Sequence, residues 1–337
     1  MKRFFLFFAS LALGAAIFFW VADSVGWAGI AGSILIFAKW QGWVIFLATF
    51  LVFLMGIWRW REIIKSLSPG SPLKGTAGAY LAGYSLMYLA PVLVLGGEAF
   101  RVYSLKEKNG VPQARGAASV FIDRFLEWTF NIVVIIFGIV FFFLNYQFDL
   151  VPKEISLVFG AVFLISVLAI AVFYIKMFRK ESIVGGILNF LGLRKIVKGK
   201  DIFEIEKEIF GFFKIENVLM WKAMAISLFR AVLLAVRTWA LALFLGKNVA
   251  FGGTLTILSF NYLASMLPIP AALGAHEALQ VLAFDSLGIE ASSAIGFAMV
   301  TRSCEIVFSI IGVIILFKFS YDLLKRSIFK KIDNFKR

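Results

Sequence analysis

Long apolar runs, separated by short polar segments, dominate the hydrophobic pattern of the chain. The runs lie at about 4–22, 42–58, 75–97, 116–144, 155–177, 218–245, 251–288 and 291–318. A helix needs about 20 predominantly apolar residues to cross the hydrocarbon core of a bilayer. Most of these eight hydrophobic segments reach that length, so the pattern predicts an all-α protein that crosses a membrane several times.

Two of the runs differ from an ordinary span. Residues 75–97 end in LAPVLVLGG, and residues 251–288 contain LPIPAALGAHEAL. Proline and glycine interrupt a helix and free backbone N–H and C=O groups that lipid cannot satisfy. Such backbone is tolerated at membrane depth only where protein or a water-filled cavity surrounds it. We therefore expect two broken, re-entrant hairpins and six full spans.

The basic residues gather in clusters beside the apolar runs. The clusters are Lys2 with Arg3, the group Arg59, Arg61, Lys65 and Lys74, the run 176–200, and the tail from Lys318. Cytoplasmic loops of membrane proteins carry an excess of Lys and Arg. A full crossing by residues 75–97 would place the basic stretch 101–115 outside. With both hairpins re-entrant, every cluster lies on one side, so both termini are predicted to be cytoplasmic.

Composition agrees with a membrane protein. Hydrophobic residues make up 61% of the 337 positions and charged residues only 16%, whereas soluble domains average roughly 45–50% and about 25%. A net charge of +14 would suit a nucleic-acid partner, but the positive-inside rule already accounts for the basic clusters, and we expect none. One cysteine and one histidine exclude a disulfide framework and a His/Cys zinc site, and no nucleotide-binding loop occurs, so no cofactor is expected.

Two segments flank or link the spans. The N-terminus resembles a signal peptide, but Trp20 stands where a cleavage site requires a small residue, which favours a retained first span. In the linker 178–216, the stretch DIFEIEKEIFGFFK has apolar residues at helical spacing with charges between them. This pattern predicts an amphipathic helix on the cytoplasmic membrane surface.

An internal repeat relates the two halves of the chain. The sequence YLA occurs at Tyr88 and again at Tyr262, and several charged or glycine positions recur 178 or 179 residues apart. These pairs are Glu98 with Glu277, Gly110 with Gly288, Arg124 with Arg302, Glu127 with Glu305, and Arg59 with Arg237. The single membrane domain 1–337 is thus expected to hold repeat 1 (1–145) and repeat 2 (155–320). Each would contain two spans, a broken hairpin and a further span. The predicted topology gives them opposite orientations, as in many transporters.

Charged residues inside the apolar runs are the candidate site. They are Glu98, Arg101, Asp123, Arg124 and Glu127 in the first repeat, and His276, Glu277, Arg302 and Glu305 in the second. A charge at the bilayer centre costs about 2.5–3.5 kcal/mol on insertion scales, so such groups pair, line a cavity or serve transport. Arg124 with Glu127, and Arg302 with Glu305, are three positions apart and can pair on one helix face. The alternative is that these pairs only hold the repeats together. For His276, a hydrogen-bonding role is favoured over proton transfer.

Two stretches resemble the signature regions of the lysylphosphatidylglycerol synthase transmembrane family, whose members are flippase-like membrane proteins. They run from Gly96 to Trp128 and from Leu267 to Glu305. The matching residues are Glu98, Arg101, Gly110, Asp123, Arg124, Gly274, Glu277 and Arg302. Ala271 and Ala272 stand where the family usually has glycine, which puts hairpin flexibility and close backbone approach in doubt.

The resemblance implies movement of a phospholipid or polyprenyl-phosphate-linked headgroup across the cytoplasmic membrane. Arg124 and Arg302 would neutralise its phosphate, while Glu98 and Glu277 would receive a cationic headgroup or hold those arginines. Some relatives carry a fused catalytic domain, for which this chain leaves no room after its last span. A separate lipid transferase or glycosyltransferase is therefore an expected partner. Two alternatives stay open: an intramembrane lipid-modifying transferase with Glu98 or Glu277 as general base, and an adaptor for a glycosyltransferase.

Overall fold

A computed structural model describes residues 27–89, 96–145, 199–267 and 272–335, with short stretches at 19–20, 23, 164–165, 167–168, 171–172, 174–176 and 269. Throughout these ranges all regular structure is helical. The elements are α2 (Trp27–Leu35), η1 (Ile36–Ala38), α3 (Trp40–Leu67), α4 (Thr76–Leu89), α5 (Gly96–Asn109), α6 (Gln113–Asn145), α9 (Gly199–Phe212), α10 (Val218–Phe244), α11 (Phe251–Ser265), α12 (Ala275–Asp285) and α13 (Ala291–Phe335).

Four of these helices are long and apolar enough to cross a bilayer. They are α3, α6, α10 and the part of α13 up to Phe319. All four coincide with predicted full spans, and large apolar side chains such as Trp43, Phe137 and Phe229 are exposed on their outer surfaces. The other two predicted spans, 4–22 and 155–177, lie largely outside the described residues. The described part of the chain is thus an all-helical, multi-pass membrane protein.

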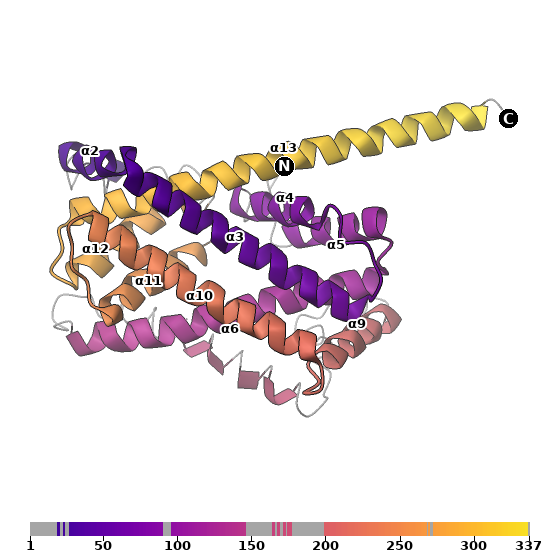
Figure 1. Cartoon of the computed structure of the whole chain (residues 1–337), viewed down its shortest axis with the longest axis horizontal. Coiled ribbons are helices and arrows are strands. Elements are labelled where there is room, and N and C mark those ends of the chain that lie inside the picture. Colours follow the sequence, from indigo (N-terminus) through magenta and orange to yellow (C-terminus); the bar gives the residue numbers. More distant parts are fainter. Residues whose placement is uncertain are drawn as a thin grey trace.

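The four long helices form a bundle in which α3 and α13 run in one direction and α6 and α10 run in the other (Figure 1). Helix α3 runs from the end of the bundle that carries α2 to the end that carries α9, and α10 packs along it on the way back. Helix α6 runs toward the α2 end, whereas α13 starts there and continues past the opposite end of the bundle. Helix α3 therefore runs opposite to α10, the first long helix of the second half, and α6 runs opposite to α13, the last long helix of that half.

Two pairs of short helices occur at the predicted hairpins, although the first pair continues beyond the predicted bounds of 75–97 as far as Asn109. Helices α4 and α5, which lie between α3 and α6 in the sequence, pack against each other. So do α11 and α12, which lie between α10 and α13. Each pair returns to the end where it started. The Asn109 side chain donates a hydrogen bond to the Lys74 carbonyl at 3.0 Å, and Lys247 Nζ lies 4.0 Å from Glu290 Oε1.

Each hairpin packs against the last long helix of the other half. The Ser85 hydroxyl of α4 donates to the Ser309 carbonyl of α13 at 2.7 Å, and the Ser259 hydroxyl of α11 donates to the Val134 carbonyl of α6 at 3.1 Å. Glycines make this approach possible. A Cβ atom on Gly312 would collide with Ser85 Oγ, and one on Gly138 would collide with Ser259 Oγ. The two halves are therefore interleaved.

The buried apolar side chains gather mainly around the two hairpins. One core cluster joins α3, α4, α5, α6 and α13, with Trp60, Tyr80 and Phe308 among its members. The other joins α3, α6, α10, α11, α12 and α13 and includes Phe260 and Phe284. These cores hold each hairpin rigidly against the long helices that carry the charged residues.

Helix α9 forms within the linker where the sequence predicts an amphipathic helix. Its Ile209 and Phe212 are buried against Ile63 and Leu67 of α3 and against residues of α6 and α10. This part of the apolar face is covered by the protein's own helices. From the sequence, the whole apolar face of this helix was predicted to lie on the membrane surface, because periodicity shows that a face is apolar but not what covers it.

Candidate functional site

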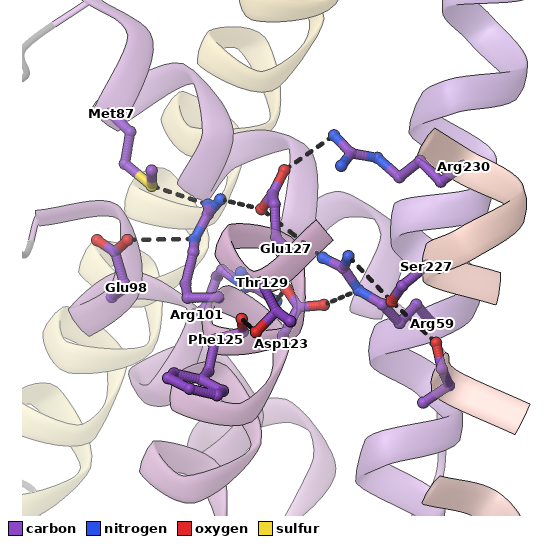
Figure 2. A network of polar contacts seen from close by, with 12 residues as sticks. Arg59, Met87, Glu98, Arg101, Asp123, Phe125, Glu127, Thr129, Ser227 and Arg230 are labelled. Carbon is purple, nitrogen blue, oxygen red and sulfur yellow. Dashed lines mark hydrogen bonds and ion pairs between the residues drawn. The ribbon is translucent and has the colours of Figure 1, made fainter. Parts of the chain in front are cut away.

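Seven charged residues form a network inside the bundle, and we refer to them as the first cluster (Figure 2). They come from four helices and are Arg59 of α3, Glu98 and Arg101 of α5, Asp123, Arg124 and Glu127 of α6, and Arg230 of α10. Successive members on α6 lie within one or two helical turns, so their side chains project toward the same region. The network therefore joins the two halves of the chain through α10.

Asp123 is the closed part of this cluster. Its Oδ1 accepts a hydrogen bond from Arg59 Nε at 2.7 Å and its Oδ2 accepts one from Arg101 Nη2 at 2.7 Å, with all three side chains buried. The Arg101 guanidinium also lies over the rings of Trp60 and Tyr80, at 4.1 and 4.8 Å from their centres. Cation–π contacts of this kind strengthen when they are removed from water. Asp123 and Arg101 are thus fixed by packing on every side.

Glu127 and Arg124 are the more open part. Arg124 Nη1 donates to Glu127 Oε2 at 2.7 Å, Arg230 Nη2 lies 2.9 Å from Glu127 Oε1, and Arg124 Nε lies 3.3 Å from Glu98 Oε1. These four side chains are 12–19% exposed, whereas Asp123 is fully buried. Arg124 Nη2 also contacts the sulfur of Met87 at 2.9 Å. The pair predicted from the spacing of Arg124 and Glu127 is present.

The first cluster carries an excess of positive charge. Four arginines face three carboxylates, which leaves one positive charge uncompensated within the described residues. Several buried nitrogen atoms of these arginines, among them Nη1 of Arg101 and Nε of Arg230, have no hydrogen-bond acceptor in the described part of the chain. Buried donors usually find a partner. An anion entering beside Arg124 and Arg230 would find both charge and donors.

A second cluster lies at the other hairpin and consists of Arg237, Glu277, Arg302 and Glu305. Arg302 Nη1 donates to Glu277 Oε1, and Glu277 Oε2 accepts the backbone N–H of Gly274 at 2.8 Å. Glu277 therefore caps the first turn of α12 as well as holding Arg302. Arg237 Nη2 lies 3.7 Å from Glu305 Oε1. Two arginines balance two carboxylates.

One predicted contact of this second cluster is wrong. The spacing of Arg302 and Glu305 predicts that they pair with each other, but Arg302 contacts Glu277 and Glu305 pairs with Arg237 instead. Residues three apart on a helix have a weak mutual preference of about 0.2–0.5 kcal/mol. A buried partner on another helix easily outweighs it.

His276 and the residues before it shape the second hairpin. His276 is buried, and its Nε2 lies 3.4 Å from the Ser265 hydroxyl at the end of α11. Ala272 adopts φ +48° and Gly274 adopts φ +76°. Left-handed backbone is costly for alanine and free for glycine, so Ala272 adopts a backbone geometry that glycine would adopt at no cost.

The two clusters repeat each other's contacts. Arg59 Nη1 donates to the Ser227 hydroxyl at 3.5 Å, and Arg237 Nη1 donates to the Thr49 hydroxyl at 3.2 Å. Both the arginines and their hydroxyl partners are 178 positions apart. Likewise Arg59 lies 3.7 Å from Glu127 and Arg237 lies 3.7 Å from Glu305. Each arginine thus reaches from its own half into the long helix of the other.

The clusters meet at the ends of α4 and α11. Met87 contacts Arg124, and the hydroxyl of the next residue, Tyr88, interacts electrostatically with Arg302 and Glu305. The repeat-related Tyr262 interacts with Arg230, Arg237 and Glu127. Both tyrosine hydroxyls are buried, and the Tyr262 hydroxyl has no hydrogen-bond partner among the described residues. Arg124 and Arg302 therefore approach the same end of α4, and neither lies at a solvent-exposed edge.

Comparison with known proteins places the chain in a family. The family model of the lysylphosphatidylglycerol synthase TM region matches residues 7–312. The chain belongs to this family. The UPF0104 membrane protein MJ1595 of Methanocaldococcus jannaschii is 25% identical over 293 residues, which cover 81% of each chain. No solved structure matches the chain.

In this member of the lysylphosphatidylglycerol synthase TM region family, the two signature stretches build the two clusters. The first forms α5 and the start of α6, which carry five of the seven residues of the first cluster. The second forms α12 and the start of α13, which carry Glu277, Arg302 and Glu305. All nine residues predicted for the site are therefore within or directly beside these networks.

Sequence reasoning missed five contributors to the site, two of which, Arg59 and Arg237, had been noted only as a pair in the repeat. Arg230 was overlooked because the repeat places Val52 at its equivalent position, so it has no repeat partner. The signal was its spacing, since Arg230 and Arg237 are seven residues apart in an apolar run and so lie on one helix face. Tyr88 and Tyr262 were used only as markers of the repeat, although both hydroxyls face the charges.

Proposed function

We propose that this protein moves a lipid with a phosphate headgroup across the membrane through a polar path between the two clusters. The observation that carries the proposal is the buried first cluster, with one arginine more than carboxylates and with unused N–H donors beside Arg124 and Arg230. A phosphate fits this excess because arginine binds it with two parallel hydrogen bonds. Membership of the lysylphosphatidylglycerol synthase TM region family supports a role in lipid transport.

The path would run between inverted repeats. The supporting facts are the equal order of elements in the two halves, the opposite directions of their long helices (Figure 1), and the repeated arginine–hydroxyl contacts. Transporters with inverted repeats commonly bind substrate near the bilayer midplane, at broken helices between the repeats. In the absence of lipid, Glu98 and Glu277 hold Arg124 and Arg302, and a phosphate would replace these carboxylates.

The hairpins would be re-entrant and the basic end of the bundle cytoplasmic. Both ends of each hairpin lie together, and the end that carries α9 also carries Lys65, Lys74, Lys108 and Arg115. The positive-inside rule assigns that end to the cytoplasm. Both termini would then be cytoplasmic, where a separate lipid transferase or glycosyltransferase would supply or use the lipid.

The test is reconstitution of the purified protein in liposomes with a fluorescent phospholipid in one leaflet. The proposal expects relocation of headgroups with no change in lipid mass. Arg124→Ala and Arg302→Ala should each reduce this rate to that of empty liposomes, because a phosphate would lose its ligand while the protein still inserts. Arg115→Ala is the matched control, since Arg115 is exposed and pairs only with Glu208 among the described residues.

Three results would contradict the proposal. Normal rates in both variants would remove the two arginines from the path. A changed lipid mass would favour the transferase, although both oxygens of Glu277 are already engaged. The absence of both movement and mass change would leave an adaptor role.

A further inference from the structure

An apolar groove on the side of the bundle begins beside the first cluster. It has a volume of about 740 Å³ and lies between α6, α10 and α11. Its lining includes Phe130, Phe137, Ala231, Trp239, Phe251 and Leu255. Apart from Thr254, whose hydroxyl donates to the Ala250 carbonyl at 3.3 Å, the lining side chains are aliphatic or aromatic. The volume is within the roughly 300–1,000 Å³ that is usual for small-molecule sites.

The groove and the first cluster are continuous along two helices. Ala231 follows Arg230 directly on α10, and Phe130 lies one helical turn beyond Glu127 on α6. The ion pair between Arg230 and Glu127, at 2.9 Å, therefore lies next to this end of the groove, although neither residue is part of its lining. From there the groove follows α10 as far as Trp239 and reaches Phe251 at the start of α11.

We propose that this groove holds one hydrocarbon chain of a phosphate-bearing lipid whose headgroup binds Arg230. The inference rests on the proposed function and names the site at which its substrate binds before it is moved. Charge complementarity selects this occupant, because an apolar groove beside a cluster with one arginine more than carboxylates matches a molecule with a long apolar tail and an anionic head. Arg230 has no counterpart in the first half, so the site belongs to one side of the bundle only.

The length of the groove fits one leaflet. From Leu228 to Trp239 the α10 backbone rises about 16 Å at roughly 1.5 Å per residue. That is about half of the roughly 30 Å hydrocarbon core, so the groove is about as long as one acyl chain. The chain end would point toward the α2 end of the bundle and the phosphate toward the α9 end (Figure 1). This is the orientation of a lipid that enters from the leaflet on the basic side.

Photo-crosslinking tests both the occupant and its direction. The full-length protein in nanodiscs is exposed to phosphatidylglycerol that carries a diazirine either at the end of one acyl chain or next to the glycerol. The chain-end probe should label peptides around Phe251 and Leu255, and the glycerol-side probe should label peptides around Phe130 and Ala231. Diacylglycerol with the same chains should label the groove less, and Arg230→Gln should remove the difference between the two lipids.

A matched pair of variants isolates the groove. Ala231→Trp fills it beside Arg230, while Ala225→Trp makes the same change at an exposed position of α10 outside the groove. Labelling should fall about tenfold in Ala231→Trp, the loss expected from roughly two fewer buried methylene groups, and should persist in Ala225→Trp.

Several outcomes would overturn the inference. These are labelling spread evenly over the outer surface, labelling unaffected by Ala231→Trp, and crosslinks to residues 155–177 in place of the groove, which would show that this segment is the occupant. The liposome assay separates the two proposals. Groove labelling without headgroup movement supports the lipid site and contradicts the transport function, whereas movement that survives without groove labelling contradicts the lipid site alone.

Discussion

At the scale of single residues, the charges of the first cluster differ in how much they are enclosed. Asp123 is fully buried with two arginines at 2.7 Å, while Glu98 is 19% exposed with one arginine at 3.3 Å. Removing one partner of a buried, hydrogen-bonded pair leaves an uncompensated charge, but partly exposed pairs contribute little. The enclosed residues hold the fold, and the open ones are available for a ligand.

Asp123→Asn should therefore lower the free energy of unfolding by about 3–5 kcal/mol, because Arg59 and Arg101 lose their shared counter-charge. Glu98→Gln should lower it by no more than about 1 kcal/mol. Denaturation of the purified variants in detergent, followed by circular dichroism, measures both. Equal losses in the two variants would contradict the division into closed and open parts.

Sequence alone predicted eight of the charged residues that form the two clusters but not all of their pairs. The pair of Arg124 and Glu127 followed from helical spacing. The contact of Arg302 with Glu277 joins two helices across a turn, and no spacing rule reaches that far. Arg230 shows the opposite limit, since a search for repeats ignores a residue whose counterpart is valine.

At the scale of elements, close helix contacts hold the hairpins in place. The hydroxyls of Ser85 and Ser259 bond to backbone carbonyls of the other half, at positions where Gly312 and Gly138 leave room. Small residues allow helices to approach closely within a membrane, where the hydrophobic effect does not drive helix association. These contacts set the position of the charged ends of α4 and α11.

Gly138→Ala and Gly312→Ala should each lower the free energy of unfolding by about 1–3 kcal/mol, because the new Cβ meets a serine oxygen and a leucine carbonyl. Gly211→Ala on α9 is the control. Its Cβ would meet nothing within 4 Å, so the better helix propensity of alanine should raise stability by about 0.5–1 kcal/mol. Thermal melting of the three variants measures the direction of each change in stability. An unchanged or raised melting temperature in both Gly138→Ala and Gly312→Ala would contradict the packing argument.

The breaks between α4 and α5 and between α11 and α12 were predicted, but the helices that pack against these pairs were not, and re-entry from one side of a membrane stays a prediction. Proline and glycine at membrane depth indicate a break whatever the rest of the fold does. Gly138 and Gly312, by contrast, look like ordinary small residues within apolar runs, and only the three-dimensional structure shows that each receives a hairpin from the other half. The covered face of α9 was missed for the same reason.

At the scale of the whole molecule, both ends of each hairpin lie together. The exposed positions Lys74 and Glu107 flank the first hairpin, and Asn248 and Glu290 flank the second. Each can be changed to cysteine singly in a chain whose own cysteine has been removed by Cys304→Ser. Single cysteines at Lys74 and Glu107 should react with an impermeant thiol reagent only from the cytoplasmic side, and those at Asn248 and Glu290 only from the opposite side. Opposite accessibility within either pair would show that the hairpin crosses the membrane.

The lengths of the apolar runs predicted a helical, multi-pass membrane protein, because those lengths reflect the thickness of the bilayer. The asymmetry between the two halves of the chain was not predicted. The positions equivalent to Arg101 and Asp123 are Gln280 and Thr301, so the second cluster is neutral and smaller than the first. A comparison of the two repeats finds the residues that both halves share and does not reveal the positions at which they differ.

The exchange of hairpins also bears on how such a chain could arise. Helix α4 covers α13 and α11 covers α6. A half expressed alone would therefore expose a glycine-lined helix face and would leave its own hairpin without the helix that it packs against. If the two repeats have opposite orientations, as we propose, a single-copy ancestor would have needed a second copy inserted in the opposite direction to cover these faces, whereas a duplicated and fused chain carries both directions within itself.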